Sequence, residues 1–147
     1  IGLSPDGKRL YVIPSRQADM LVYDVTGPGK IASGRTLCRL RQPQGKDNTG
    51  GDGMAVDVEG NLYITTNLGV EIFSQAGKHL GLVAFPQQPA NVTFGGADRK
   101  TMYVTARTGL YRVAMPIAGL NPNRSKLERS KRDDDNGCMM IKCLDRF

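Results

Sequence analysis

Two oxygen-bearing residues, Asp52 and Asn91, hold similar places in the sequence and are the first candidates for chemistry. Asp52 lies eleven residues before Tyr63, and Asn91 lies twelve residues before Tyr103, across a turn that we take to be one residue longer. A carboxylate oxygen and an amide oxygen are hard ligands of the kind that Ca²⁺, Mg²⁺ and Mn²⁺ prefer. Both residues are therefore predicted to be repeat-equivalent and to face the same opening, where the pair predicts a divalent-cation site.

Simpler interpretations of the same residues stay open. Asp52 precedes Gly53, and Asp-Gly is a common turn pair. Asn91 begins an Asn-Val-Thr acceptor sequon for glycosylation, which has meaning only in a secreted protein. We interpret Asp6 and Asp57 as a turn residue and a strand-end residue rather than as ligands.

The sequence favours no other catalytic or metal-binding set. His79 is the sole histidine, so a Ser-His-Asp or Cys-His mechanism would have to use it. It follows a turn, and we interpret it as a surface residue. Cys38 lies in an apolar stretch and is predicted to be a small buried hydrophobic residue. Cys138 and Cys143 have no histidine or further cysteine nearby to complete a zinc site.

The elements that must position these residues recur along the chain. Three segments share an apolar run, a polar turn and a strand with a central tyrosine; the tyrosines are Tyr11, Tyr63 and Tyr103, spaced 52 and 40 residues apart. A further strand is predicted after each, at residues 20–25, 69–73 and 109–115, and outer strands at 35–40 and 79–85. Four short strands in a unit of about 40–50 residues indicate a β-propeller blade.

The predicted fold is therefore all-β, with about three blades of a partial propeller. No stretch before residue 120 has helical periodicity, and no Gly-rich phosphate loop occurs. Closed propellers have about four to eight blades, so the remaining blades lie either on residues outside this sequence or on a second copy. Ile1 opens within a strand, which favours the first explanation. Open sheet edges also predict self-association.

Two regions follow from this pattern: a partial propeller over residues 1–119 and a charged tail over residues 120–147. Nine charged residues fall within residues 124–135, and such a run is expected to be solvated and disordered.

Composition excludes several classes of partner. The chain carries 20 Lys and Arg against 14 Asp and Glu, a net charge of +6. Aromatic residues do not alternate with the basic cluster of Arg35, Arg39 and Arg41, so no nucleic-acid partner is expected. No apolar run reaches the ~18 residues of a membrane helix. No secretory signal occurs in the residues given, which favours the cytoplasm although residues upstream are expected.

Two stretches carry a family resemblance. Residues 51–63, Gly-Asp-Gly-Met-Ala-Val-Asp-Val-Glu-Gly-Asn-Leu-Tyr, followed by Asn-Leu-Gly-Val at 67–70, are similar to the gluconolactonase family. That family is also called the senescence marker protein or regucalcin family. Residues 91–96 leading to Thr-Met-Tyr-Val-Thr-Ala at 101–106 resemble it as well. The resemblance covers about residues 1–119 and matches the C-terminal half of the family's fold.

The resemblance implies a six-bladed propeller that holds one divalent metal ion, Ca, Zn, Mg or Mn, and hydrolyses sugar lactones, a type of carboxylic ester. Its ligands are a Glu from the first blade, an Asn from a middle blade and the Asp that matches Asp52. The same match implies that Asp52 is the proton donor and acceptor. Blade symmetry suggests that Asn91 contacts substrate hydroxyls. The Glu and the Asn ligands would precede Ile1, so this chain is expected to be incomplete as an enzyme.

Two alternatives remain beside the lactonase. The chain could be a non-catalytic propeller fragment that binds calcium or a protein. It could also belong to a propeller of the strictosidine-synthase or arylesterase type, which shares the fold but has other channel residues.

Overall fold

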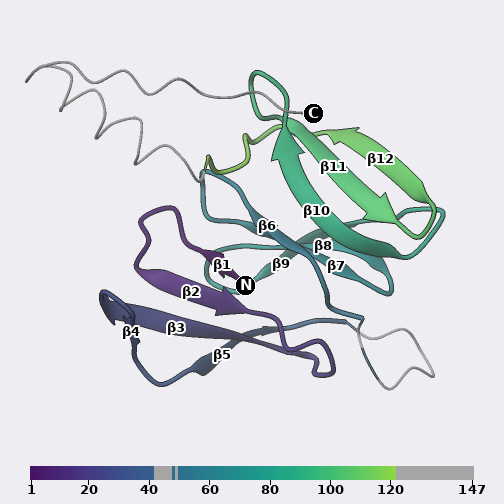
Figure 1. The fold of residues 1–147 in the computed structure, drawn as a ribbon. Helices are drawn as coiled ribbons and strands as arrows, with labels where there is room; N and C mark the ends of the chain where they lie inside the picture. The colour runs from purple at the N-terminus through teal and green to yellow at the C-terminus, as the bar shows by residue number, and fades with distance from the viewer. Residues whose placement is uncertain (42–47, 49, 122–147) are drawn as a thin grey trace, which may run out of the picture.

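The computed structural model describes residues 1–41, 48 and 50–121, and within these residues every regular element is a β-strand (Figure 1). The strands form three antiparallel sheets that follow one another in chain order. No helix in this part of the chain is long and apolar enough to cross a membrane.

The first sheet has five strands, with the order β1-β2-β3-β4 and with β5 paired to β3. Its strands are β1 (Gly2–Leu3), β2 (Arg9–Val12), β3 (Asp19–Gly27), β4 (Lys30–Ile31) and β5 (Arg35–Arg39). The turn between β1 and β2 contains Asp6, whose carboxylate accepts hydrogen bonds from the Ser4 hydroxyl and the Lys8 amide. These bonds hold the pKa of the Asp6 carboxyl below its usual value, the Ser4 bond most strongly.

The second sheet has four strands and the third has three, each in simple sequential order. The second comprises β6 (Met54–Val56), β7 (Leu62–Thr66), β8 (Gly69–Phe73) and β9 (His79–Val83). The third comprises β10 (Pro89–Gly95), β11 (Thr101–Ala106) and β12 (Gly109–Ala114). Tyr11, Tyr63 and Tyr103 all lie on the second strand of their sheets, as the repeat predicts.

The first strands of the sheets converge. Strand β6 contacts both β1 and β10, and it lies between them in Figure 1. Apolar side chains fill the space between neighbouring sheets in two clusters. One joins the first and second sheets through residues such as Tyr11 and Ile64, and the other joins the second and third through residues such as Val70 and Met102. The rings of Tyr63 and Phe94 meet edge to face, with centroids 4.9 Å apart.

After β12 the chain returns to the second sheet. The Leu120 amide donates to the Val56 carbonyl at 2.8 Å, and the Val58 amide donates to the Ala118 carbonyl at 2.9 Å. Arg99 holds this return segment from the third sheet, because its guanidinium donates to the carbonyls of Gly119 and Leu120 at 3.0 and 2.7 Å. Backbone contacts therefore continue past the predicted boundary at residue 119, to Leu120 and its bond with Val56.

The all-β fold and its partial-propeller architecture are confirmed. The predicted strands and hairpin turns recur with small shifts at their ends, and the third unit has three strands among the described residues, as expected. The proposed tail and its charged run, with Cys138 and Cys143, lie in residues 122–147, outside the described residues. The division at residue 119 and the self-association of open edges stay predictions.

Candidate functional site

Asp52 lies just before the inner strand of the second sheet, on a backbone anchored to two other strands. Its amide donates to the Thr65 carbonyl at 3.2 Å. The next amide, that of Gly53, points at both the Ala90 carbonyl at 2.9 Å and the Thr65 hydroxyl at 2.7 Å. That hydroxyl in turn donates to the Ala90 carbonyl at 3.0 Å. Thr65 is fully buried, so the backbone on the C-terminal side of Asp52 is fixed to both β7 and β10.

Gly53 brings the Asp52 loop against Asn91. A Cβ atom on Gly53 would lie 2.5 Å from the Cα of Asn91, 2.4 Å from its Oδ1 and 2.8 Å from the Ala90 carbonyl oxygen. Contacts this short leave room for hydrogen only, so glycine is required by close approach rather than by an unusual φ angle. The structure therefore places Asp52 and Asn91 on neighbouring backbone segments at the same end of the inner strands.

The strict repeat equivalence of the two residues, however, does not hold. In the β-ladders Tyr63 opposes Ala55, whereas Tyr103 opposes Thr93. Asp52 is three residues before Ala55, and Asn91 is two residues before Thr93. The stretch from Thr93 to its partner Tyr103 is therefore two residues longer than the stretch from Ala55 to its partner Tyr63, whereas the sequence comparison assumed one. A separate irregularity in the ladder lies between Pro89 and Asn91. The two residues are neighbours because the strands touch at Gly53, and not because they hold the same repeat position.

The side chains of both residues reach solvent. Within the described part of the chain, the Asp52 carboxylate forms no hydrogen bond or ion pair. The Asn91 Oδ1 accepts a hydrogen bond from the Val92 amide at 2.9 Å, and no hydrogen bond from its Nδ2 is found among the described residues. A mainly apolar groove lined by residues of β1, β6 and β10 begins at Met54 and Val92, directly beyond the pair.

The donor set fits part of a divalent-cation site. The free Asp52 carboxylate offers oxygen ligands of the right chemistry for Ca²⁺, Mg²⁺ or Mn²⁺, whereas the Asn91 Oδ1 already accepts the Val92 amide. Among the described residues no group of three or more His, Cys, Asp or Glu side chains could hold a metal ion. Asp52 can thus provide one ligand, and the rest of a coordination sphere must come from other groups. The predicted roles of Asp52 and Asn91 therefore stay predictions.

Sequence reasoning missed a buried charge in the second sheet. The Glu71 side chain is fully buried, and its Oε2 lies 3.1 Å from Nε of Arg41 and 3.5 Å from Nε2 of His79. The Arg41 amide also donates to Glu71 Oε1 at 3.2 Å. The interpretation of His79 as a plain surface residue is wrong, because its ring packs against Phe73 and its Nε2 faces Glu71.

Two other predictions agree with the structure. Cys38 is buried, and burial is the main cause that raises the pKa of its thiol to about 12, followed by the nearby Glu71 and Asp19 carboxylates. Asp57 is a fully buried strand-end residue rather than a ligand. It accepts hydrogen bonds from the Asn61 side chain and the Tyr63 hydroxyl at 2.8 and 3.0 Å.

Comparison with known proteins identifies relatives of this chain. The family model described as the SMP-30/Gluconolactonase/LRE-like region matches residues 1–108. The chain is 37% identical over 109 residues to a regucalcin of Xenopus laevis, covering 70% of this chain and 35% of that protein. It is 34% identical over 125 residues to a gluconolactonase of Zymomonas mobilis, covering 81% of this chain and 35% of that protein.

A solved structure supports the fold. The crystal structure of a calcium-binding protein, regucalcin, from Agrobacterium tumefaciens superposes with a TM-score of 0.63 and 20% identity. The match covers 81% of this chain and 45% of that one. The chain spans about a third of the length of the curated relatives it matches.

Proposed function

The chain belongs to the SMP-30/gluconolactonase/LRE-like family, and we propose that it supplies part of the active site of a metal-dependent sugar lactonase. Relatives named gluconolactonase and regucalcin support a lactonase-family function. The observation that carries the proposal is the exposed, unpaired Asp52 carboxylate on a rigid backbone beside Asn91. Residues outside this sequence, which spans about a third of those relatives, complete the site.

Asp52 has two chemical tasks in this proposal. One carboxylate oxygen is a ligand of a divalent cation, which when bound polarises the lactone carbonyl. The other oxygen accepts a proton from the water that attacks the carbonyl carbon. The bond between that carbon and the ring oxygen then breaks, and the ring oxygen takes the proton from Asp52. The product is the open hydroxy acid, and Asp52 returns to its ionised form.

Asn91 orients the substrate. Because its Oδ1 already accepts one hydrogen bond from the Val92 amide, we assign the Nδ2 group as the donor to substrate. A sugar lactone carries several hydroxyl groups, and one of them accepts this hydrogen bond. The donor role differs from metal ligation, for which the oxygen would have to be the outward atom.

Glucono-δ-lactone hydrolysis tests the proposal, measured on wild-type protein and the Asp52→Asn variant, each prepared together with the residues outside this sequence that complete the site. Both are stripped with EDTA and assayed again after Ca²⁺, Mg²⁺, Mn²⁺ or Zn²⁺ is added. We expect the metal-dependent rate of Asp52→Asn to fall at least ~100-fold, the lower range for loss of a general base. Asp24→Asn is the matched control, because Asp24 is exposed on β3 and forms only a surface ion pair with Arg35. An Asp52→Asn variant with the wild-type metal-dependent rate would refute the assignment.

A second function, calcium binding without catalysis, is considered because the described residues offer Asp52 but no group of three or more His, Cys, Asp or Glu side chains that could hold a metal ion. Calorimetry with CaCl₂ separates the two. Calcium uptake that disappears in Asp52→Asn, together with no hydrolysis of the lactone, would support binding alone. Hydrolysis that depends on Asp52 would support the lactonase.

A further inference from the structure

Three polar side chains from separate loops form a continuous hydrogen-bonded line at the Asp52 end of the sheets. Arg107, in the turn between β11 and β12, donates through Nη2 to Oε1 of Gln88. Gln88, just before β10, donates through Nε2 to Oδ1 of Asn67 at 2.6 Å. Asn67, in the turn between β7 and β8, donates through Nδ2 to the backbone carbonyl of Asn48 at 3.0 Å and to its Oδ1 at 3.3 Å.

The direction of every bond in this line is set by its first member. A guanidinium only donates, so the Gln88 atom that faces Arg107 must be the amide oxygen. The NH₂ group of Gln88 then faces Asn67, which must present its own oxygen there. The NH₂ group of Asn67 is left to point at Asn48, where it meets two acceptors. The Arg107 guanidinium thus sets which end of the Gln88 amide faces it, and through Gln88 it sets the orientation of the Asn67 amide.

The line ends on the segment that carries Asp52. The Asn48 side chain accepts a hydrogen bond from the Gly50 amide at 3.1 Å. Gly50 has a φ of +64°, and a Cβ there would lie 2.2 Å from Oδ1 of Asn67. Asn67 therefore hydrogen-bonds this segment at Asn48 and packs closely against it at Gly50, two residues before Asp52. The Gly53 bonds anchor the segment one residue after Asp52. Asp52 lies between two fixed points.

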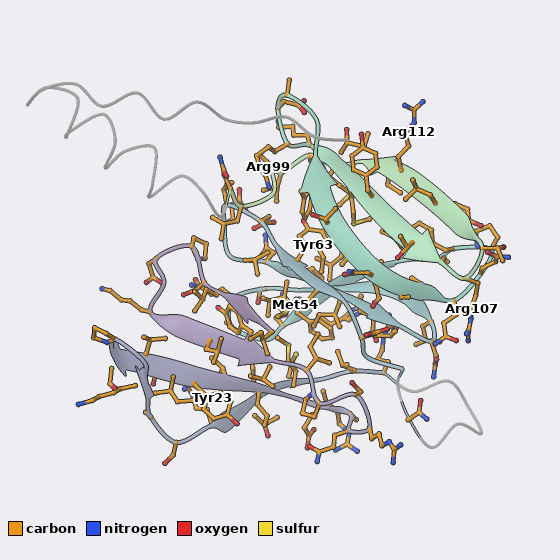
Figure 2. All side chains as sticks on the ribbon, in the orientation of Figure 1. Tyr23, Met54, Tyr63, Arg99, Arg107 and Arg112 are labelled. Atoms are coloured by element: carbon orange, nitrogen blue, oxygen red, sulfur yellow. The ribbon has the colours of Figure 1, made fainter. Side chains whose placement is uncertain are left out.

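Arg107 occupies a backbone position that does not suit arginine. Its φ is +49°, in the left-handed region where glycine, asparagine and aspartate are the ordinary residues. Figure 2 shows Arg107 at the tip of the third sheet, at the opposite end from Arg99. A side chain kept at an unfavourable φ is consistent with a task performed by its head group. Among the described residues, the contact of this head group is with Gln88 Oε1.

We propose that Arg107, Gln88 and Asn67 are positioning residues that hold the Asp52 loop for catalysis. This inference rests on the proposed function for its effect on the reaction, but not for its effect on the loop. None of the three needs to touch substrate, because they act through the backbone on the N-terminal side of Asp52.

The variant Gln88→Glu tests the direction of the bonds without a change of shape. The introduced carboxylate still accepts from Arg107 but has no proton to donate to Asn67. Two acceptors then face each other, or Asn67 flips and loses its bonds to Asn48. In hydrogen–deuterium exchange we expect the amides of residues 50–53 to exchange ~fivefold faster, the effect of one typical hydrogen bond. In the lactone assay we expect kcat to fall ~tenfold with KM unchanged, because the loop holds Asp52 and not the substrate.

Gln87→Glu is the matched control. Gln87 also links this connection to the β11–β12 turn, but its partner is the Thr108 hydroxyl and its contacts do not reach Asn67. A hydroxyl can donate to the introduced carboxylate, so exchange and kcat should remain as in wild type. Arg107→Gly is the second test variant, because glycine accepts the positive φ. If Arg107 has no role in holding the loop, the Arg107→Gly protein should be as stable as wild type or more stable, and the amides of residues 50–53 should exchange at the wild-type rate. Our proposal predicts faster exchange of these amides.

The possible outcomes separate the positioning role of Arg107, Gln88 and Asn67 from the proposed lactonase function. Unchanged exchange at residues 50–53 in Gln88→Glu and Arg107→Gly, or equal acceleration in Gln87→Glu, would overturn the positioning role. Faster exchange with wild-type kcat would also overturn it, because the loop would then not control Asp52. If the wild-type protein opens no lactone, the proposed function fails, and the exchange ratio alone supports or overturns the hold on the loop.

Discussion

Gly53→Ala should destabilise the protein because the added methyl group has no space. Its Cβ would lie 2.5 and 2.8 Å from backbone atoms of Asn91 and Ala90, which cannot move without displacing β10. Overpacking of this kind costs about 1–3 kcal/mol. The displacement also threatens the bond from the Gly53 amide to the Ala90 carbonyl, worth about 1 kcal/mol net. Reduced backbone entropy of the unfolded chain returns about 0.4–1 kcal/mol. We therefore expect a net loss of about 1–3 kcal/mol.

Urea denaturation of wild type, Gly53→Ala and Gly81→Ala measures this effect. Gly81 lies on β9 with a φ outside the left-handed region, and a Cβ there meets nothing within 4 Å. Gly81→Ala should therefore be neutral or slightly stabilising, which isolates the steric term. Gly53→Ala should also lower any Asp52-dependent activity, since it moves the loop away from Asn91. Equal stability of the two alanine variants would refute the close approach of β6 and β10 and with it the shared opening.

Two further predictions concern the buried groups of the first two sheets. Arg41→Ala should lower the free energy of unfolding by about 3 kcal/mol in urea denaturation at pH 7, because it leaves the fully buried Glu71 without its cation. Glu71→Gln should lower the free energy of unfolding by less, because the Arg41 side chain is 49% exposed and water can solvate it. Equal losses of stability in the two variants would contradict this reasoning. Burial raises the Cys38 thiol pKa from 9.0 to about 12, so the folded state retains a proton that the unfolded state releases. The free energy of unfolding should thus fall as pH rises from about 9 to 12, less steeply in Cys38→Ala; identical slopes would contradict the shift.

The repeated strands can be predicted from the sequence because the patterns that indicate them are local. Alternating apolar residues and Asp-Gly or Ala-Gly turns act over a few positions, so three hairpin-rich sheets could be predicted before any contact was known. The buried Cys38 and the strand-end role of Asp57 followed from the same patterns. The offset between Asp52 and Asn91 could not be predicted, because the connection from Thr93 to its partner Tyr103 is two residues longer than the connection from Ala55 to its partner Tyr63. Counting back from a tyrosine finds the equivalent residue only when the length of this connection is known.

Glu71 shows a second limit of the pattern. A charged residue in a strand normally marks the solvent face, and the sequence Gly-Val-Glu-Ile-Phe at β8 gives no other signal. The side chain is nevertheless fully buried, since Arg41 from the segment just after β5 and His79 from β9 enclose it. The partner lies thirty positions earlier in the chain, and only the stacking of neighbouring sheets brings it close.

The same reasoning explains why Asp52 cannot be understood from its own sheet. Thr65 on β7 supplies one anchor within the second sheet, but Ala90, Gln88 and Arg107 all belong to the third sheet or the segment leading into it. In a protein built of stacked repeats, each unit is stabilised by its neighbours. Here the position of the Asp52 carboxylate in the second sheet also depends on residues of the third. A substitution that loosens the third sheet should therefore reduce the order of the Asp52 loop before it unfolds the second sheet. The candidate site is thus a property of the junction between units, where the inner strands converge.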